Sequence, residues 1–142
     1  MRKNELVTKI MTPASEVQSV HVDQKLSEVR HILADHQVHH VPVLSGDNIV
    51  GLISATDMLK MTFTAYGGDD RSFDAYLDHE FKIEDVMTRD LSTLTNHSTI
   101  REASLTLSEG IFNSLPILDD ESKFVGLLTT KDLARHVHDL YS

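Results

Sequence analysis

Cysteine is absent from the 142-residue chain, so neither disulfides nor thiolate metal sites can hold the fold together. Long apolar runs are missing too: the opening residues MRKNELVTKIMTPASE do not form the apolar core of a signal peptide, and no segment is long enough to span a bilayer. Positive charge is in deficit, with 13 Lys and Arg against 22 Asp and Glu. An acidic chain repels phosphate backbones. We therefore expect a soluble cytoplasmic protein that binds neither nucleic acid nor membrane.

Catalytic signatures are also missing. The sequence contains no Gly-rich phosphate loop of the GxxxxGK[ST] kind, no HExxH pattern, and no nucleophile with an adjacent base at a recognisable spacing. Aspartates and serines are present, but any chain of this size supplies them. We therefore predict that the protein is not an enzyme and requires no cofactor.

The composition that remains is typical of a globular protein, with 40% hydrophobic and 25% charged residues. This length suits one compact domain, or two small halves that share a core. Two independent globules are not expected.

Three short patterns occur twice in the chain. The heptads GLISATD and GLLTTKD are 75 residues apart, since Gly51 matches Gly126 and Asp57 matches Asp132. The other two pairs are IMT with VMT and HVPVL with SLPIL, which begin at residues 10 and 86 and at residues 40 and 114. Each copy is too short to bury a sizeable core alone, so the two copies are expected to pack against each other.

Each copy has the periodicity of strand, helix, strand, strand and helix. The first strand is predicted at 17–22, with a counterpart around 91–95, and the two middle strands form a hairpin that leads into the heptad. Apolar residues recur at helical spacing in the first helix of each copy, at Leu26, Val29 and Leu33 and at Ile100, Ala103 and Leu107. The predicted division is repeat 1 at 1–62, a connector with a short helix at 63–81, and repeat 2 at 82–142.

The connector contains a second helical pattern. Phe73, Tyr76, Leu77 and Phe81 recur at helical spacing, so we expect this segment to pack against the body of the protein. An ordered linker helix and a lid over a ligand are both compatible with the pattern.

The heptad itself admits two interpretations. Ser54 with Asp57, and Thr129 with Asp132, fit the S/T-x-x-D pattern of a helix start, in which the hydroxyl and the carboxylate satisfy backbone N–H groups. The same junction of strand and helix can also hold a nucleotide, because N–H groups at a helix start attract phosphate and a carboxylate suits a ribose diol. The residues alone leave both interpretations open.

With IMT, HVPVL and VGLISATD, and their counterparts VMT, SLPIL and FVGLLTTKD, the sequence resembles a tandem pair of CBS domains, called a Bateman module. The resemblance implies an α/β fold of two pseudo-symmetric β-α-β-β-α repeats packed through their sheets into one module. It further implies a regulatory ligand sensor that binds AMP, ADP, ATP or another adenosyl ligand between the repeats. A homodimer through the terminal helices of the repeats and an unknown regulated protein in trans are also implied.

The resemblance assigns residues to two clefts, each with walls from both repeats. In one cleft Asp57 would hold a ribose, Ser54 and Thr56 would lie near the phosphate, and Asn113 and Ser114 near the base. The residues of the other cleft would be Asp132, Thr129 and Lys131, opposite Val22, His39 and His40. Lys131 supplies a cation that Thr56 lacks, so the Asp132 cleft is expected to bind more tightly, with AMP favoured.

Two rival functions remain. One is a scaffold for dimerisation or protein docking that binds no ligand, which the apolar residues Met58, Leu59, Met61 and Phe63 favour. The other is a divalent-metal site built from the histidines that cluster at 31–40. Under that alternative, His39 and His40 would be metal ligands instead of cleft residues.

Overall fold

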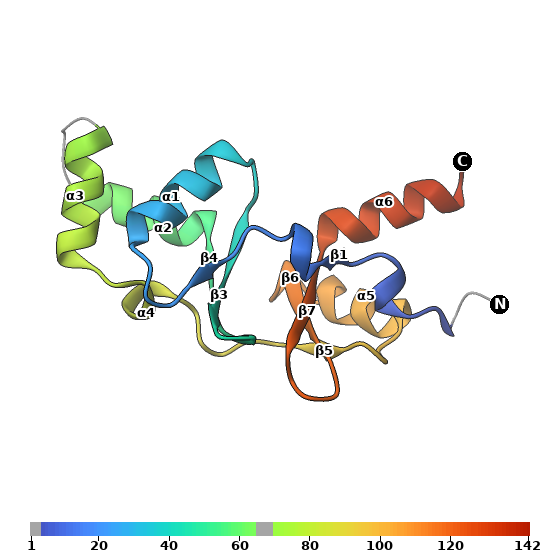
Figure 1. Cartoon of the computed structure of the whole chain (residues 1–142). Coiled ribbons are helices and arrows are strands. Elements are labelled where there is room, and N and C mark those ends of the chain that lie inside the picture. Colours follow the sequence, from blue (N-terminus) through green and yellow to red (C-terminus); the bar gives the residue numbers. More distant parts are fainter. Residues whose placement is uncertain (1–3, 65–69) are drawn as a thin grey trace. The chain divides into compact units, whose positions relative to one another are not determined.

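The computed structural model describes residues 4–64 and 70–142, without the side chains of 62–64 and 70. The chain forms two compact units (Figure 1). The continuous unit comprises residues 18–90, and the split unit combines 1–17 with 91–142. Each unit has a mixed sheet with helices, which confirms the predicted α/β class.

The continuous unit contains a sheet in the order β2-β3-β4, in which β2 and β3 are parallel and β3 and β4 form an antiparallel hairpin. The predicted hairpin and helices are therefore confirmed in this unit. Its elements in chain order are β2 (Val20–His21), α1 (Leu26–Asp35), β3 (His40–Ser45), β4 (Asn48–Ser54), α2 (Ala55–Thr64), α3 (Asp70–Glu80) and α4 (Ile83–Val86).

The split unit repeats this arrangement and adds a strand, in the order β1-β7-β6-β5. Its last helix, α6, follows β7 directly, as α2 follows β4. Its elements in chain order are η2 (Val7–Lys9), β1 (Thr12–Pro13), η3 (Ala14–Glu16), β5 (Leu94–Thr95), α5 (Ile100–Ser108), β6 (Ser114–Leu118), β7 (Phe124–Thr129) and α6 (Thr130–Leu140).

The IMT and VMT segments exchange partners between the repeats. In the split unit, Thr12 of β1 pairs with Leu127 of β7 (Figure 1). In the continuous unit, Thr88 forms the matching antiparallel bridge with Leu52 of β4. Each heptad strand is therefore extended by the short segment that belongs, by sequence, to the other repeat. The predicted boundaries at 62 and 82 separate the sequence repeats. The compact units have different boundaries, after residues 17 and 90.

The two heptad glycines permit this exchange. A Cβ atom at Gly51 would lie 2.7 Å from Met87 Cγ, and one at Gly126 would lie 2.9 Å from the backbone oxygen of Thr12. Both distances are shorter than van der Waals contact. The glycine of each heptad is thus required by the close approach of the exchanged segment.

Each unit has its own apolar core. In the continuous unit α1, the sheet, α2, α3 and Met87 all contribute, and Met58 and Met61 of α2 are buried. The core of the split unit is formed by Val7, α5 and the strands β6 and β7, with Leu133 of α6 only partly buried against it. No residue of α6 is fully buried.

The connector helix α3 packs against α1, as the sequence predicts. Leu77 is completely buried. Asp74 accepts a hydrogen bond from Arg30 Nε at 2.7 Å and lies 2.6 Å from His31 Nε2. The Arg30 hydrogen bond, with help from His31, lowers the pKa of Asp74 below its ordinary value of 3.8.

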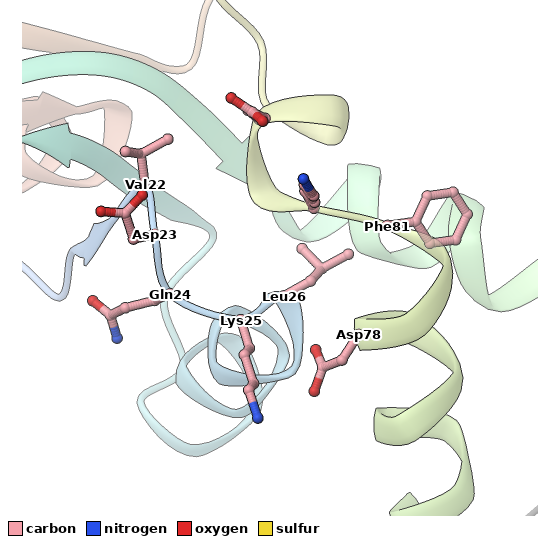
Figure 2. A pocket seen from close by; sticks show the side chains of 9 residues that line it. Val22, Asp23, Gln24, Lys25, Leu26, Asp78 and Phe81 are labelled. Carbon is pink, nitrogen blue, oxygen red and sulfur yellow. The ribbon is translucent and has the colours of Figure 1, made fainter.

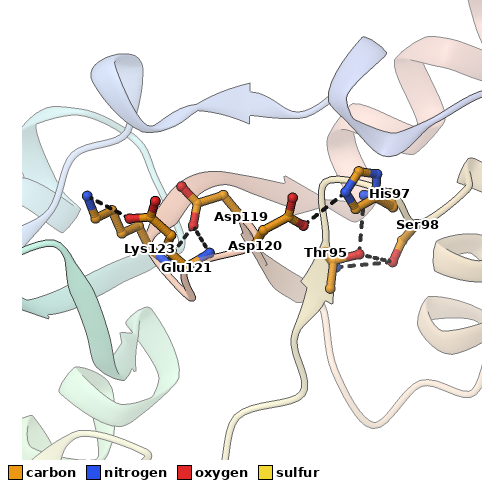
Figure 3. A network of polar contacts seen from close by, with 7 residues as sticks. All are labelled: Thr95, His97, Ser98, Asp119, Asp120, Glu121 and Lys123. Carbon is orange, nitrogen blue, oxygen red and sulfur yellow. Dashed lines mark hydrogen bonds and ion pairs between the residues drawn. The ribbon is translucent and has the colours of Figure 1, made fainter.

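The turn between β6 and β7 is held by its own side chains (Figure 3). Asp119 Oδ1 accepts hydrogen bonds from the N–H groups of Glu121 and Lys123, at 2.8 and 2.9 Å. Asp120 lies 2.9 Å from Nε2 of His97, in the loop after β5. This hairpin turn is thus tied to the loop after β5.

Candidate functional site

The first heptad forms the junction of β4 and α2. The Ser54 N–H donates to Asp57 Oδ2 at 2.9 Å, and the Asp57 N–H donates to Ser54 Oγ at 3.1 Å. This is a complete capping box at the start of α2. The other oxygen, Asp57 Oδ1, accepts no hydrogen bond from any described residue, and the Thr56 side chain is exposed.

The second heptad forms the same junction between β7 and α6. The Thr129 N–H donates to Asp132 Oδ2 at 3.0 Å, and the Asp132 N–H donates to Thr129 Oγ1 at 3.2 Å. Here the carboxylate has a further donor, because Thr12 Oγ1 lies 3.2 Å from Asp132 Oδ1 and 3.4 Å from Oδ2. Both heptads therefore cap a helix, as the S/T-x-x-D pattern predicts. Among the described residues, the Asp132 carboxylate accepts one more side-chain donor than the Asp57 carboxylate does.

The structure brings the predicted base-side residues next to the heptad of their own unit. The Ala55 N–H donates to the His39 carbonyl at 2.9 Å, and His40 pairs with Ser54 across the hairpin. In the split unit the Thr130 N–H donates to the Asn113 carbonyl at 3.1 Å. The predicted pairing of walls from opposite repeats stays a prediction.

Ser114 and Lys131 complete the predicted set in the split unit. Ser114 pairs with Thr129 in the hairpin and is buried. The Lys131 side chain is exposed and makes no ion pair with a described residue. A cation is therefore available beside Asp132, whereas the corresponding position beside Asp57 is the uncharged Thr56.

Val22 lies apart from the two histidines with which it was grouped. Its N–H donates to the Leu44 carbonyl at 2.9 Å. Leu44 is four residues after His40 on β3, a separation of about 13 Å along a strand. The three residues therefore do not form one continuous patch, and a ligand contact at Val22 stays a prediction.

Val22 instead contributes to a pocket of about 340 Å³ where the β2–α1 turn meets the end of α3 and the start of α4 (Figure 2). Asp78 of α3 lies at this pocket and accepts hydrogen bonds from the N–H and Oγ of Ser27, at 2.9 and 2.7 Å. The lining residues are Val22, Asp23, Gln24, Lys25, Leu26, Asp78, Phe81, Lys82 and Glu84. The pocket thus marks the docking of the connector onto α1.

His40 is partly buried and pairs with Ser54 of the first heptad across the hairpin. Burial lowers the pKa of His40 below its ordinary value of 6.5, the neighbouring His39 lowers it further, and the Asp57 carboxylate opposes both effects. The neutral imidazole is therefore favoured at neutral pH. This side of the first heptad thus offers a hydrogen-bonding group without a positive charge.

The histidine cluster does not converge on one point. His36 follows α1, whereas His40 begins β3. Over residues 4–64 and 70–142, no group of three or more His, Asp or Glu side chains is placed to hold a metal ion. The metal alternative therefore gains no support from the geometry.

Thr12 is the residue that sequence reasoning missed. Its signal is present in the sequence, since IMT is repeated as VMT, but the repeat alone does not indicate which strand each segment pairs with. The pairing of β1 with β7 brings Thr12 to Asp132. Thr88 occupies the matching position in the continuous unit, and its hydroxyl makes no hydrogen bond with a described residue.

The model of the CBS domain family matches residues 7–62 and 83–139. The chain belongs to the CBS domain family. The two matches confirm the tandem CBS pair that the repeated motifs indicated.

Solved structures of other CBS pairs share this fold. The crystal structure of CBSX2 from Arabidopsis thaliana in complex with AMP is 21% identical, with a TM-score of 0.80 over 97% of this chain and 99% of that chain. The CBS domain pair of protein MJ0100, in complex with 5-methylthioadenosine and S-adenosyl-L-methionine, is 22% identical, with a TM-score of 0.72 over 93% of this chain and 98% of that chain.

Curated relatives are much longer proteins. Inosine-5'-monophosphate dehydrogenase of Bacillus subtilis is 26% identical over 117 residues, which cover 80% of this chain and 21% of that protein. This chain thus matches about a fifth of that relative.

Within the described part of this chain, no helix has the length and apolar character needed to cross a membrane.

Proposed function

We propose that this CBS pair is a regulatory sensor for an adenine nucleotide, with AMP as the favoured ligand. The observation that carries the proposal is the doubled strand-to-helix junction, which holds a hydroxyl, a helix start and a carboxylate within one turn in both units. Helix-start N–H groups attract phosphate oxygens, and a carboxylate accepts from a ribose diol. CBS pairs of the same fold with bound AMP or S-adenosyl-L-methionine support an adenosyl ligand.

The capping boxes are compatible with this role. Each capping box places one hydrogen bond on one carboxylate oxygen, and a carboxylate has about four lone-pair sites. The cap also fixes the rotamer of the aspartate, so the remaining acceptor sites keep one direction. A carboxylate held in this way loses little side-chain entropy when a ribose binds.

The signal would be a shift between conformations. A ligand that binds one arrangement of the protein better than another shifts the balance by its difference in affinity, and by no more. We propose that an unknown protein responds in trans to this shift, and that the chain itself has no catalytic role.

A scaffold without ligand is the second candidate, and the terminal helix favours it. Val137 and Leu140 of α6 are 48% and 39% exposed, and Tyr141 just after it is 86% exposed. Leu59 of α2 is 55% exposed. We propose that these apolar side chains pair two copies of the chain through their terminal helices, which is compatible with either function.

Thermal unfolding by circular dichroism, with AMP, ADP, ATP, NAD or S-adenosylmethionine added, tests the sensor. A ligand that binds only the folded state raises its stability by about 2.7 kcal/mol at one hundred times its dissociation constant. We expect AMP to raise the Tm, and the double variant Asp57→Asn, Asp132→Asn to lose most of the shift. Asp47→Asn, in an exposed hairpin turn, is the matched control. Absence of a shift with every ligand would favour the scaffold.

Sedimentation equilibrium tests the dimer. Val137→Glu buries a charge if the α6 face pairs, so the variant should sediment as a monomer at concentrations where the parent is dimeric. Arg135→Glu introduces the same side chain at an exposed charged position of the same helix and should leave the mass unchanged. A monomeric parent chain at high concentration would contradict the dimer.

A further inference from the structure

The pocket that Val22 lines in the continuous unit lies outside both heptads. It separates two short segments, 22–26 at the β2–α1 turn and 81–84 between α3 and α4 (Figure 2). The Val22 N–H bonds to Leu44 near the end of β3, whereas the heptad meets the start of that strand at His40. The pocket and the heptad are therefore at opposite ends of β3. The pocket volume of about 340 Å³ is within the range of small-molecule sites.

The matching segments of the split unit are joined directly. Leu6 and Thr99 form an antiparallel bridge, flanked by two backbone hydrogen bonds of 2.8 and 2.9 Å. Among the described residues of the continuous unit, no bridge or backbone hydrogen bond joins 22–26 to 81–84. The continuous unit thus has a pocket where the split unit has a backbone contact.

Two lysines occupy the positions of the bridged residues. Lys82 stands four residues before VMT, as Leu6 stands four residues before IMT. Lys25 directly precedes α1, as Thr99 directly precedes α5. A bridge between Lys25 and Lys82 would place two like charges directly opposite each other, which is destabilising. Repulsion between the two lysines therefore favours the open pocket.

The charges of the lining favour an anion of low charge. Lys25 and Lys82 are exposed and make no ion pair with a described residue, so both are available to a ligand. Asp78 already accepts two hydrogen bonds from the first turn of α1. Asp23 and Glu84 also line the pocket, and their repulsion grows with the charge of the ligand. A carboxylate with a single charge is therefore better suited than a doubly charged phosphate.

The apolar part of the lining favours a ligand with an apolar body. Leu26 is completely buried, and its side chain points toward the segment that carries Phe81 (Figure 2). Val22 and Phe81 are only partly buried, so they keep apolar surface that a ligand can cover. Covering this surface adds affinity that a bare carboxylate such as acetate does not gain.

We propose that this pocket binds a small monocarboxylate with an apolar body. The carboxylate lies between Lys25 and Lys82, and the body covers Val22 and Phe81. This site is separate from the heptads, so the inference goes beyond the proposed function and holds whether or not AMP binds. The bound anion offsets the repulsion between the lysines and draws the two segments together. Occupancy therefore stabilises the docking of the connector on α1.

Amide NMR on the full chain tests the site, with 3-phenylpropionate as the probe. The probe should shift the amides of 22–27 and 78–84 in a saturable way and leave those of 54–57, in the first heptad, unchanged. Acetate lacks the apolar body and 3-phenylpropan-1-ol lacks the charge, so each should bind more weakly. Equal affinity for the acid and the alcohol, or shifts scattered over both units, would overturn the inference. Titration with AMP on the same sample tests the proposed function separately.

Single lysine variants test the role of charge. Lys25→Gln and Lys82→Gln should each weaken 3-phenylpropionate about two- to fivefold, the usual worth of an exposed ion pair, and leave the affinity for the alcohol unchanged. Lys60→Gln, at an exposed lysine of α2 that does not line the pocket, is the matched control and should change neither affinity. An equal loss for the acid and the alcohol would show that the lysines do not hold the carboxylate, which contradicts the inference.

A double variant that copies the split unit tests why the pocket is open. Lys25→Thr with Lys82→Leu should let the two segments form the bridge seen in the split unit, and so close the pocket. The urea midpoint should rise, the Ile83 amide should exchange more slowly with solvent, and 3-phenylpropionate should no longer bind. Binding of the probe by this variant with the affinity of the parent would overturn the inference.

Discussion

The continuous unit and the split unit share one sequence pattern but close their cores differently. In the continuous unit, α3 covers α1 with the buried Leu77, and Met58 and Met61 of α2 are buried. In the described part of the split unit, residues 4–17 and 91–142, no helix lies in the position of α3, and α6 has no fully buried residue. The helix of the split unit that corresponds to α1 is α5, and its Leu105 is 66% exposed. A repeated pattern thus specifies the sheet and the caps, while inserted residues decide which helix faces are covered.

The largest expected effect on stability concerns the packing of α3 against α1. Leu77→Ala should destabilise the protein by about 2–5 kcal/mol, since it deletes completely buried methyl groups from α3. Leu105→Ala, on the exposed face of α5, should change the stability by less than about 0.5 kcal/mol. Urea unfolding followed by circular dichroism measures both. Equal losses of stability in the two variants would contradict the difference in burial between Leu77 and Leu105.

The next test concerns the two heptad glycines. Gly126→Ala and Gly51→Ala should each cost about 1–3 kcal/mol, because a Cβ overlaps the exchanged segment in both units. We expect losses of similar size, because each new Cβ meets at 2.9 Å one atom that side-chain rotation cannot move, Thr12 O at Gly126 and Met87 Cβ at Gly51. Melting temperatures of the two variants measure both losses. A variant that melts like the parent would contradict the reasoning.

Helix caps give a smaller effect and separate structure from binding. Thr129→Ala and Thr99→Ala each remove an N-cap hydroxyl in the split unit, at α6 and α5, and should each cost about 1 kcal/mol. Only the first should also weaken AMP binding, measured by calorimetry. If Thr99→Ala weakens AMP binding equally, the loss at Thr129 would reflect stability alone.

The smallest effect is a dependence on acid in the continuous unit, at Asp74. Arg30 and His31 lower the folded pKa of Asp74 below 3.8, so its contribution is present above that pH and is lost as the pH falls through the folded pKa. Asp74→Asn should therefore reduce stability by no more than about 1 kcal/mol at neutral pH. The deficit should shrink as the pH falls toward the folded pKa of Asp74. Urea midpoints at neutral pH and near pH 3 measure it, and a deficit independent of pH would contradict the ion pair.

The sequence predicted the helices and hairpins well, because their signals are local. The apolar spacing at Leu26 and Val29 gave α1, and Thr99 caps α5 by accepting from the Glu102 N–H at 3.1 Å. The strand predicted at 17–22 is shorter, at Val20–His21, because a 3-10 turn ends just before Val17 and β3 pairs with only those two residues.

Features that depend on which segments meet could not be predicted in this way. The IMT pattern was found in the sequence, but its pairing with the strand of the other repeat depends on tertiary packing. The Thr12 contact with Asp132 joins residues 120 positions apart and follows from that pairing. The sequence also does not indicate where Val22 lies relative to His39 and His40. Val22 is bonded to Leu44 near the end of β3, whereas His40 begins that strand.

The pairing of β1 with β7 affects the order in which parts of the chain can fold during synthesis. All residues of the continuous unit have been synthesised once residue 90 is added, so this unit can collapse while the ribosome is still at work. β1 precedes the continuous unit in the chain, whereas its partner β7 follows that unit. β1 must therefore wait, with its edge unprotected, until the whole continuous unit and β7 have been made.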